Sequence, residues 1–242
     1  MTKTYTPETH PLIGTVIAID GPAGAGKGTL ATELARRYRI KYLDTGTLYR
    51  MVALRVLRSG GDPSHEQDAL DACHFDDFDF KHIGNNKFSV FSHGESVMDE
   101  LRSPEVGDGA SKVAFFPGVR AALRDFQKQY AKQWQARIGV ILDGRDIGTV
   151  ICPDANFKFF LDASSEIRAK RRVDELKSRG YDVSYQETLA QILERDARDT
   201  GRTDAPLKAA DDAFIIDTSS KSPEEVLEFV MQTIGTKQSS LA

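Results

Sequence analysis

The sequence of 242 residues predicts an α/β fold with a parallel sheet flanked by helices. Short β-branched runs alternate with segments of helical periodicity, and a glycine-rich loop joins the first run to the first such segment. Hydrophobic residues make up 40% of the chain, which is enough for a substantial core. There are only two cysteines, Cys73 and Cys152, so we expect no disulfide framework and no four-ligand zinc site.

The expected elements follow one another along the chain. A buried strand over Thr15–Asp20 ends at Gly21, and a helix follows in which Leu30, Leu34 and Tyr38 recur every four residues. The other expected strands cover Lys41–Leu43, Ile138–Leu142, Phe157–Leu161 and Ala213–Ile216. The other expected helices cover Thr47–Leu57, Gly118–Trp134, a long stretch after Ser164, and Pro223–Ile234.

The segment Asp62–Leu101 interrupts this alternation. It contains ten acidic residues, two lysines and four of the five histidines, and Phe80–Phe91 has the pattern of a hairpin. We therefore expect a small acidic insertion, and the spacing of its histidines and Cys73 is not diagnostic of a metal site. The polar ends, residues 1–10 and 237–242, are expected to be flexible tails.

The balance of charge excludes some partners. Thirty-two basic residues against 36 acidic ones give a net charge of -4, and no basic run exceeds Lys170–Arg172, which disfavours a nucleic acid polymer. No apolar run approaches the ~20 residues that span a bilayer, and the first ten residues lack the apolar core of a secretory signal. A cytoplasmic protein with reduced thiols is expected.

The glycine-rich loop matches the pattern G-x-x-x-x-G-K after a strand and before a helix, a context typical of phosphate binding. Its backbone N–H groups and the helix N-terminus would surround a phosphate chain, and the lysine adds a full positive charge. The candidate ATP-binding residues are Gly21, Pro22, Ala23, Gly24, Ala25, Gly26, Lys27, Gly28 and Thr29. Gly28 follows the lysine where GTPases have Ser or Thr, and the guanine-reading motif N-K-x-D is absent.

Arginines recur near the end of the long helical stretch. Arg195, Arg198, Asp199 and Arg202 have the spacing of one helix face. Their guanidinium groups would repel one another unless an anion lay between them, and phosphate suits the arginine fork. The alternative is a solvated face with local pairs such as Glu194 with Arg198.

Polar residues also follow two of the expected strands. Asp143-Gly144-Arg145-Asp146 follows Ile138–Leu142, and Asp44-Thr45-Gly46 follows Lys41–Leu43, with Arg50 one helical turn later. Open α/β sheets bind ligands at the carboxyl ends of their strands. These side chains are therefore expected to converge on one crevice.

Taken together, these motifs resemble the cytidylate kinase family from about Ile13 to Ile234. The resemblance rests on segments that occur in the family's order: Gly21–Thr29, Leu43–Gly46 with Tyr49-Arg50, Glu105-Val106 with Ala110–Ala114 and Pro117–Arg120, Asp143–Val150, Leu161–Ser165, and Arg195–Asp199. It implies a P-loop nucleoside monophosphate kinase fold. It also implies an enzyme that transfers the γ-phosphoryl of ATP, bound with Mg²⁺, to CMP or dCMP. It also divides the chain into a core (11–61, 117–163 and 204–236), a monophosphate-binding insertion (62–116) and an arginine-rich lid with flanking helices (164–203).

The resemblance also implies roles for individual residues. Ser111, Arg120 and Asp146 would read the cytosine, whose amine suits a carboxylate and whose N3 and O2 accept from Arg and Ser. Arg195 and Asp199 would bind the sugar, near Thr45, a position at which relatives commonly carry Ser. The acceptor phosphate would be bound by Arg50, Arg145 and Arg202. Lys27, Arg145, Arg198 and Arg202 would stabilise the transition state. Mg²⁺ would be reached by Thr29 and, through water, by Asp143.

Two other functions stay open on the sequence. One is a kinase for a different acceptor, such as UMP, AMP or shikimate. The other is an ATP-binding regulatory module that transfers no phosphate, which would be expected to lack acceptor-side arginines such as Arg50 and Arg120. We expect a monomer, and the sequence does not distinguish CMP from dCMP as the preferred acceptor.

Overall fold

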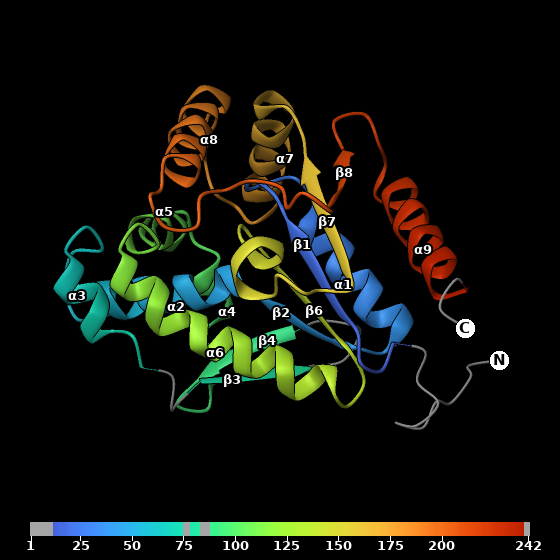
Figure 1. The fold of residues 1–242 in the computed structure, drawn as a ribbon. Helices are drawn as coiled ribbons and strands as arrows, with labels where there is room; N and C mark the ends of the chain where they lie inside the picture. Colours follow the sequence, from blue (N-terminus) through green and yellow to red (C-terminus); the bar gives the residue numbers. More distant parts are fainter. Residues whose placement is uncertain (1–11, 75–77, 83–87, 240–242) are drawn as a thin grey trace. The chain divides into compact units, whose positions relative to one another are not determined.

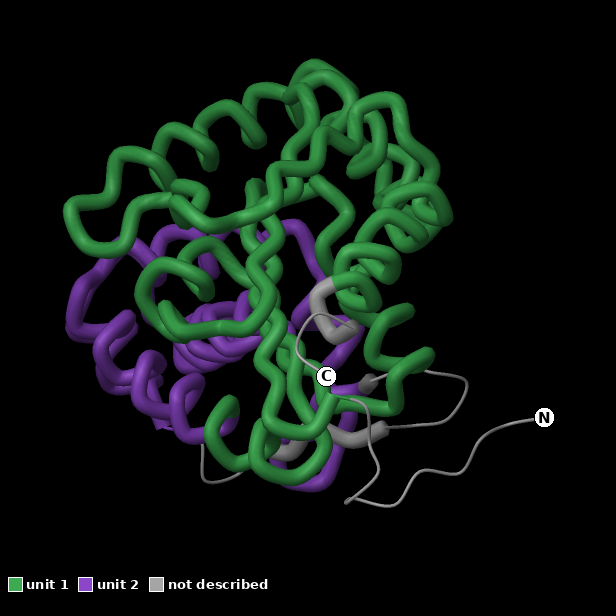
Figure 2. Tube along the Cα trace, turned by 45° about the vertical axis from the view of Figure 1, so that its right-hand side comes forward, with its two compact units in different colours: residues 1–43, 131–242 green, residues 44–130 purple. Residues whose placement is uncertain are grey.

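A computed structural model describes residues 12–74, 78–82 and 88–239. The chain, drawn with its helices and strands labelled in Figure 1, divides into two compact units, which Figure 2 shows in different colours. The first comprises Met1–Leu43 and Ala131–Ala242, and the second comprises Asp44–Tyr130. The predicted divisions at residues 62 and 116 do not coincide with these limits, and the division into core, insertion and lid stays a prediction.

The first unit is built on a five-stranded sheet, in the order β2-β6-β1-β7-β8. Its strands are β1 (Val16–Asp20), β2 (Lys41–Asp44), β6 (Val140–Gly144), β7 (Phe157–Asp162) and β8 (Phe214–Asp217). The pairs β1–β6, β1–β7 and β7–β8 are parallel, which confirms the predicted fold class. All residues of β1 and β6 are buried, as expected for a sheet covered on both faces.

The helices of the first unit follow the strand ends. They are α1 (Lys27–Tyr38), the π-helix η2 (Ile147–Ile151), α7 (Ser165–Ser178), α8 (Tyr185–Thr200) and α9 (Pro223–Ser239). The side chains of Ser164 and Ser184 accept the N–H groups of Ile167 and Glu187 and so cap α7 and α8. None of the helices in the described ranges is both long and apolar enough to cross a membrane.

The second unit packs helices around an apolar core and carries a small antiparallel sheet. Its elements are α2 (Thr45–Arg58), α3 (Glu66–Asp71), β3 (Phe78–His82), β4 (Phe88–Ser92), β5 (Glu95–Ser96), α4 (Met98–Leu101), α5 (Pro104–Val113) and most of α6 (Pro117–Gln135). Leu48, Met51, Leu101, Val113 and Leu123 are each almost fully buried in this core. The predicted hairpin is confirmed in β3 and β4, whereas its turn lies outside the described residues.

Two predicted boundaries are wrong. The strand predicted at Ile138–Leu142 begins at Val140, because Gly139 has a left-handed φ of 88° and a Cβ there would lie 2.4 Å from the carbonyl oxygen of Leu12. Helix α9 continues to Ser239, into the predicted tail of 237–242. The polar residues there are compatible with the last turn of α9. The other predicted tail, residues 1–10, lies outside the described residues.

Candidate active site

The glycine-rich loop between β1 and α1 adopts a conformation that its glycines make possible. Gly21, Gly24 and Gly26 have φ values of 143°, 81° and 94°. A Cβ at Gly21 would lie 1.9 Å from the carbonyl oxygen of Leu161 in β7, so no side chain fits there. The loop therefore has the strand-loop-helix context that phosphate binding requires.

Lys27, the first residue of α1, lies buried at 8% exposure. Its Nζ donates hydrogen bonds of 2.8 Å to the carbonyl oxygens of Gly21 and Pro22. Burial, followed by the nearby positive charge of Arg145, lowers the pKa of Lys27 to about 7, although Asp143 opposes this shift. The lysine thus already lies against the loop that is predicted to bind the phosphates of ATP.

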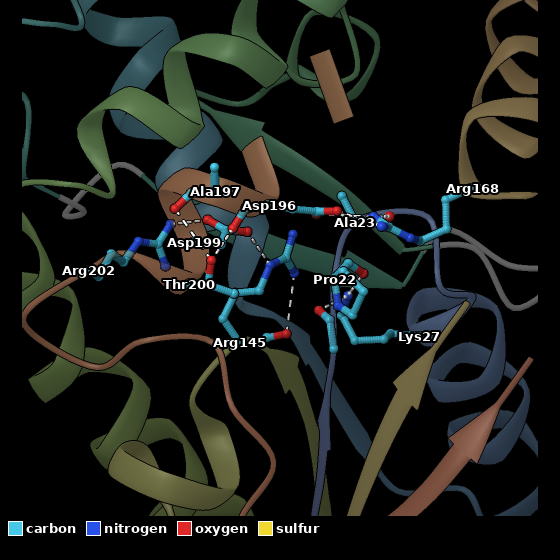
Figure 3. A network of polar contacts seen from close by, with 12 residues as sticks. Pro22, Ala23, Lys27, Arg145, Arg168, Asp196, Ala197, Asp199, Thr200 and Arg202 are labelled. Carbon is cyan, nitrogen blue, oxygen red and sulfur yellow. Dashed lines mark hydrogen bonds and ion pairs between the residues drawn. The ribbon is translucent and has the colours of Figure 1, made fainter. Parts of the chain in front are cut away.

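Arg145 and Asp199 form the centre of a charged network (Figure 3). Nε of Arg145 donates to Oδ2 of Asp199 at 2.7 Å, and the other carboxylate oxygen of Asp199 accepts from Arg202. Burial alone would raise the pKa of Asp199, but the positive charges of Arg145, Arg195 and Arg202 lower it to about 2. A carboxylate of the chain therefore lies between two of the arginines for which we expected phosphate.

The predicted arginine stripe needs one correction. Helix α8 ends at Thr200 with Gly201 as its C-cap, so Arg202 lies beyond the helix instead of on its face. Arg198 donates to Glu194 at 3.2 Å, which is the local pair that the alternative interpretation named. The chain itself thus supplies anions to these guanidinium groups.

Arg168 of α7 was not predicted as a site residue. Its guanidinium donates to the carbonyl oxygens of Ala163 and Ala23, at 2.8 and 3.2 Å, and pairs with Asp196 of α8 (Figure 3). Its side chain is only 6% exposed. Arg168 therefore connects α8 to the glycine-rich loop, and its place just before the basic run Lys170–Arg172 was the only sequence signal for it.

A second missed residue is Asp20 at the end of β1. Its carboxylate oxygens accept the N–H groups of Ile147 and Gly148, at 2.8 and 2.7 Å, where η2 begins. Burial raises the pKa of Asp20 to about 6, although the two backbone hydrogen bonds oppose this shift. Asp146, predicted to read the base, directly precedes η2 and is 6% exposed.

The sequence model of the cytidylate kinase family matches residues 17–236. The chain belongs to the cytidylate kinase family. The curated cytidylate kinase of Actinobacillus succinogenes is 42% identical over 233 residues, which cover 92% of this chain and 99% of that protein. That of Magnetococcus marinus is 46% identical over 222 residues, covering 91% and 95%. The predicted resemblance is thereby confirmed, and the chain is a phosphotransferase of this family.

Of the residues that the cytidylate kinase resemblance implies, those in the first unit are brought together. The charges of Arg145, Asp143, Arg195 and Asp20 all act on Lys27, and Arg145, Arg195 and Arg202 act on Asp199. The second unit carries the other predicted substrate residues: Thr45, Arg50, Ser111 and Arg120. Their individual roles in a cytidylate kinase stay predictions.

Within the second unit, the predicted acceptor residues lie on three helices. Thr45 begins α2 and is buried, and Arg50, further along α2, donates to the carbonyl oxygen of Leu101 at 2.6 Å. Ser111 of α5 and Arg120 of α6 are 2% and 3% exposed. In the described part of the chain, the buried Oγ of Ser111 has no hydrogen-bond partner. A buried hydroxyl of this kind suits a ligand with a polar edge.

The residues predicted to reach a metal fit a magnesium ion that is held mainly by phosphates. Thr29 is exposed on α1, and a Cβ on Gly28 would lie 3.9 Å from Oδ2 of Asp143, so this carboxylate lies beside the loop. Mg²⁺ commonly binds through one or two protein oxygens together with substrate phosphates and water. Over the described ranges, no three His, Cys, Asp or Glu side chains form a cluster that would hold a metal by themselves.

Proposed function

We propose that this member of the cytidylate kinase family transfers the γ-phosphoryl of ATP to CMP or dCMP, giving ADP and CDP or dCDP. One observation carries the proposal beyond the family: Lys27, at the start of the helix after the glycine-rich loop, lies within electrostatic range of Arg145 and Arg195. Phosphoryl transfer depends on positioning and on stabilising charge on the phosphoryl oxygens, so a buried lysine beside arginines suits it.

We infer that ligand phosphates replace contacts that the chain makes with itself. Lys27 would exchange the carbonyl oxygens of Gly21 and Pro22 for the β- and γ-phosphates of ATP. Arg145 and Arg202 would turn from Asp199 to the acceptor phosphate, which leaves Asp199 with Arg195 for the sugar. Arg198, Arg145 and Arg202 would then neutralise the charge that develops during transfer.

The acceptor base would be read by hydrogen bonds. Asp146 would accept from the amine of cytosine, and Arg120 and Ser111 would donate to its N3 and O2. The burial of all three side chains, between 2% and 6% exposed, supports this assignment, because discrimination is strongest where an unmatched polar group is cut off from water. Thr45 would lie near the sugar.

Further parts of the proposal rest on the sequence. When bound, Mg²⁺ would neutralise the ATP phosphates, held by the hydroxyl of Thr29 and through water by Asp143. We expect the kinase to act as a monomer in the cytoplasm, with no nucleic acid polymer as partner.

An acceptor panel tests the function. With ATP and Mg²⁺, CMP should exceed UMP in kcat/KM by at least about tenfold, because UMP would place a carbonyl oxygen against the carboxylate of Asp146. Asp146→Asn should narrow this ratio, mainly by lowering the value for CMP. Steady-state phosphorylation of CMP, dCMP, UMP and AMP measures both effects. If UMP or AMP matched CMP in the wild type, the proposed acceptor would be wrong, although the protein would remain a kinase.

A pH prediction follows from Lys27. Its pKa of about 7 means that much of the lysine is neutral at pH 8, whereas bound phosphates favour the charged form. ATP binding at pH 8 should therefore take up a proton, and affinity should fall as the pH rises above about 7. Calorimetry at pH 8 in two buffers of different ionisation enthalpy measures the uptake. Lys27→Gln should abolish it, and equal apparent enthalpies for the wild type would contradict the prediction.

A further inference from the structure

Asp20 connects the central strand to the segment that carries Asp146. It is the last residue of β1 and is 4% exposed. Oδ1 accepts from the N–H of Ile147 at 2.8 Å and Oδ2 from that of Gly148 at 2.7 Å. The first N–H groups of a helix have no partner within it, and here a carboxylate 127 positions away in the sequence binds two of them.

The segment η2 is short, so the contact with Asp20 adds substantially to its own backbone hydrogen bonds. It is a single π-turn of five residues, in which the N–H groups of Val150 and Ile151 donate to Asp146 O at 2.9 and 3.2 Å, and Cys152 N–H donates to Ile147 O at 2.7 Å. Isolated π-turns are rare and occur often at functional sites. Asp146 is the N-cap residue, yet its side chain makes no capping hydrogen bond. The backbone that places Asp146 is therefore held from outside the turn.

Gly148 of η2 also lies close to a side chain of β7. A Cβ on Gly148 would lie 3.2 Å from Cδ of Lys158 and 3.4 Å from Oδ2 of Asp20. Lys158 is itself buried and fixed by a 2.8 Å ion pair with Asp212. Gly148 thus fits closely between two anchored side chains, and a shift of η2 would have to displace one of them.

We propose that Asp20 is a positioning residue for the choice of acceptor base, because it fixes η2 and thereby the place of the Asp146 carboxylate. This proposal rests on the proposed function, in which Asp146 accepts from the amine of cytosine. Asp20→Asn keeps the shape of the side chain but turns an amide N–H₂ toward one of the two N–H donors, which would push the start of η2 away. Displacements of about 1 Å are enough to change a reaction rate strongly.

A double-mutant cycle tests the proposal. The four proteins are the wild type, Asp20→Asn, Asp146→Asn and the double variant, and kcat and KM are measured for CMP and UMP at saturating ATP. Asp20→Asn should lower the CMP/UMP ratio of kcat/KM at least about fivefold, with the KM for ATP within about twofold of the wild type. In the Asp146→Asn background, the same change should not narrow the ratio further.

A matched control separates this role from damage to the neighbouring loop. Asp162 also ends a strand beside the loop, and its Oδ1 accepts a backbone N–H, that of Ala163, at 2.8 Å without reaching η2. Asp162→Asn should leave the CMP/UMP ratio unchanged. Amide hydrogen exchange of the ligand-free proteins gives a readout without activity: exchange at residues 147–152 should quicken in Asp20→Asn and stay as in the wild type in Asp162→Asn.

The outcomes separate the two proposals. Suppose that Asp146→Asn narrows the CMP/UMP ratio of kcat/KM, whereas Asp20→Asn changes neither this ratio nor the amide exchange at residues 147–152. Asp20 then does not position Asp146, and the inference is overturned. If Asp146→Asn itself has no effect on the ratio, the base-reading role fails, and with it the role of Asp20. Should Asp20→Asn fail to fold, Gly148→Ala crowds Lys158 and Asp20 with the carboxylate intact. If exchange at residues 147–152 then quickens while the CMP/UMP ratio stays as in the wild type, the inference is overturned.

Discussion

Lys27→Ala should lower kcat by at least about 100-fold, which is the usual size of the effect when one preorganised charge is removed from a reacting phosphate or oxyanion. Within the described residues its Nζ donates to two carbonyl oxygens of the loop, so the fold should survive the change. Steady-state phosphorylation of CMP measures the loss, and circular dichroism checks the fold. Removal of this buried cation also relieves the cost of its burial, so stability should not fall.

A second lysine provides the control for this variant. Lys170 lies exposed on α7 and has no predicted role, so Lys170→Ala should retain wild-type activity. Native circular dichroism together with retained activity in Lys27→Ala would refute the phosphate-binding assignment.

Asp199→Asn should lower the free energy of unfolding by about 3 kcal/mol, because removal of one partner leaves buried charges uncompensated. The side chains of Asp199, Arg145 and Arg202 are only 1%, 16% and 5% exposed. The pKa of Asp199, about 2 in the folded chain, is below its ordinary value of 3.8. Its stabilising contribution is therefore complete above pH 3.8 and disappears as the pH falls through about 2. Urea denaturation at pH 7 and pH 3 measures both effects.

Glu33 is a matched control for burial. Hydrogen bonds from Arg36 and Arg37 also lower its pKa to about 2, yet its side chain is 32% exposed. Exposed ion pairs contribute little because water screens them. Glu33→Gln should therefore cost far less than Asp199→Asn, and equal losses for the two variants would show that burial of the Asp199 network does not determine its strength.

Local sequence patterns predicted the loop and the polar residues at two strand ends, but they could not predict contacts between distant segments. The conformation around Lys27 follows from neighbouring glycines, which is why the motif was informative. The pair Arg145–Asp199 joins residues 54 positions apart, and local patterns named only phosphate or a neighbouring side chain such as Glu194 as the anion for these arginines. The prediction that Arg202 lies on the helix face was wrong, because α8 ends at Thr200 and Gly201 is its C-cap.

The helices of the second unit show a different limit. Helix α5 contains Gly107 and Gly109, which are poor helix formers, so its pattern did not predict a helix. Both glycines allow close packing: a Cβ on Gly109 would lie 3.1 Å from the Cβ of Ala53, and one on Gly107 3.3 Å from Nη1 of Arg50. Here tertiary packing outweighs local helix propensity, and the sequence of one segment does not show which other segment will pack against it.

Several partners from other elements also hold the glycine-rich loop along its length. Gly21 lies against the backbone of β7, the carbonyl of Ala23 accepts from Arg168, and that of Ala25 lies 3.1 Å from the hydroxyl of Thr218. Such a loop loses little conformational freedom when a polyphosphate arrives, so the entropy cost of ordering is met during folding. Ligand selection then becomes a matter of rigid shape, because a loop held in this way cannot adapt to an anion that does not match it.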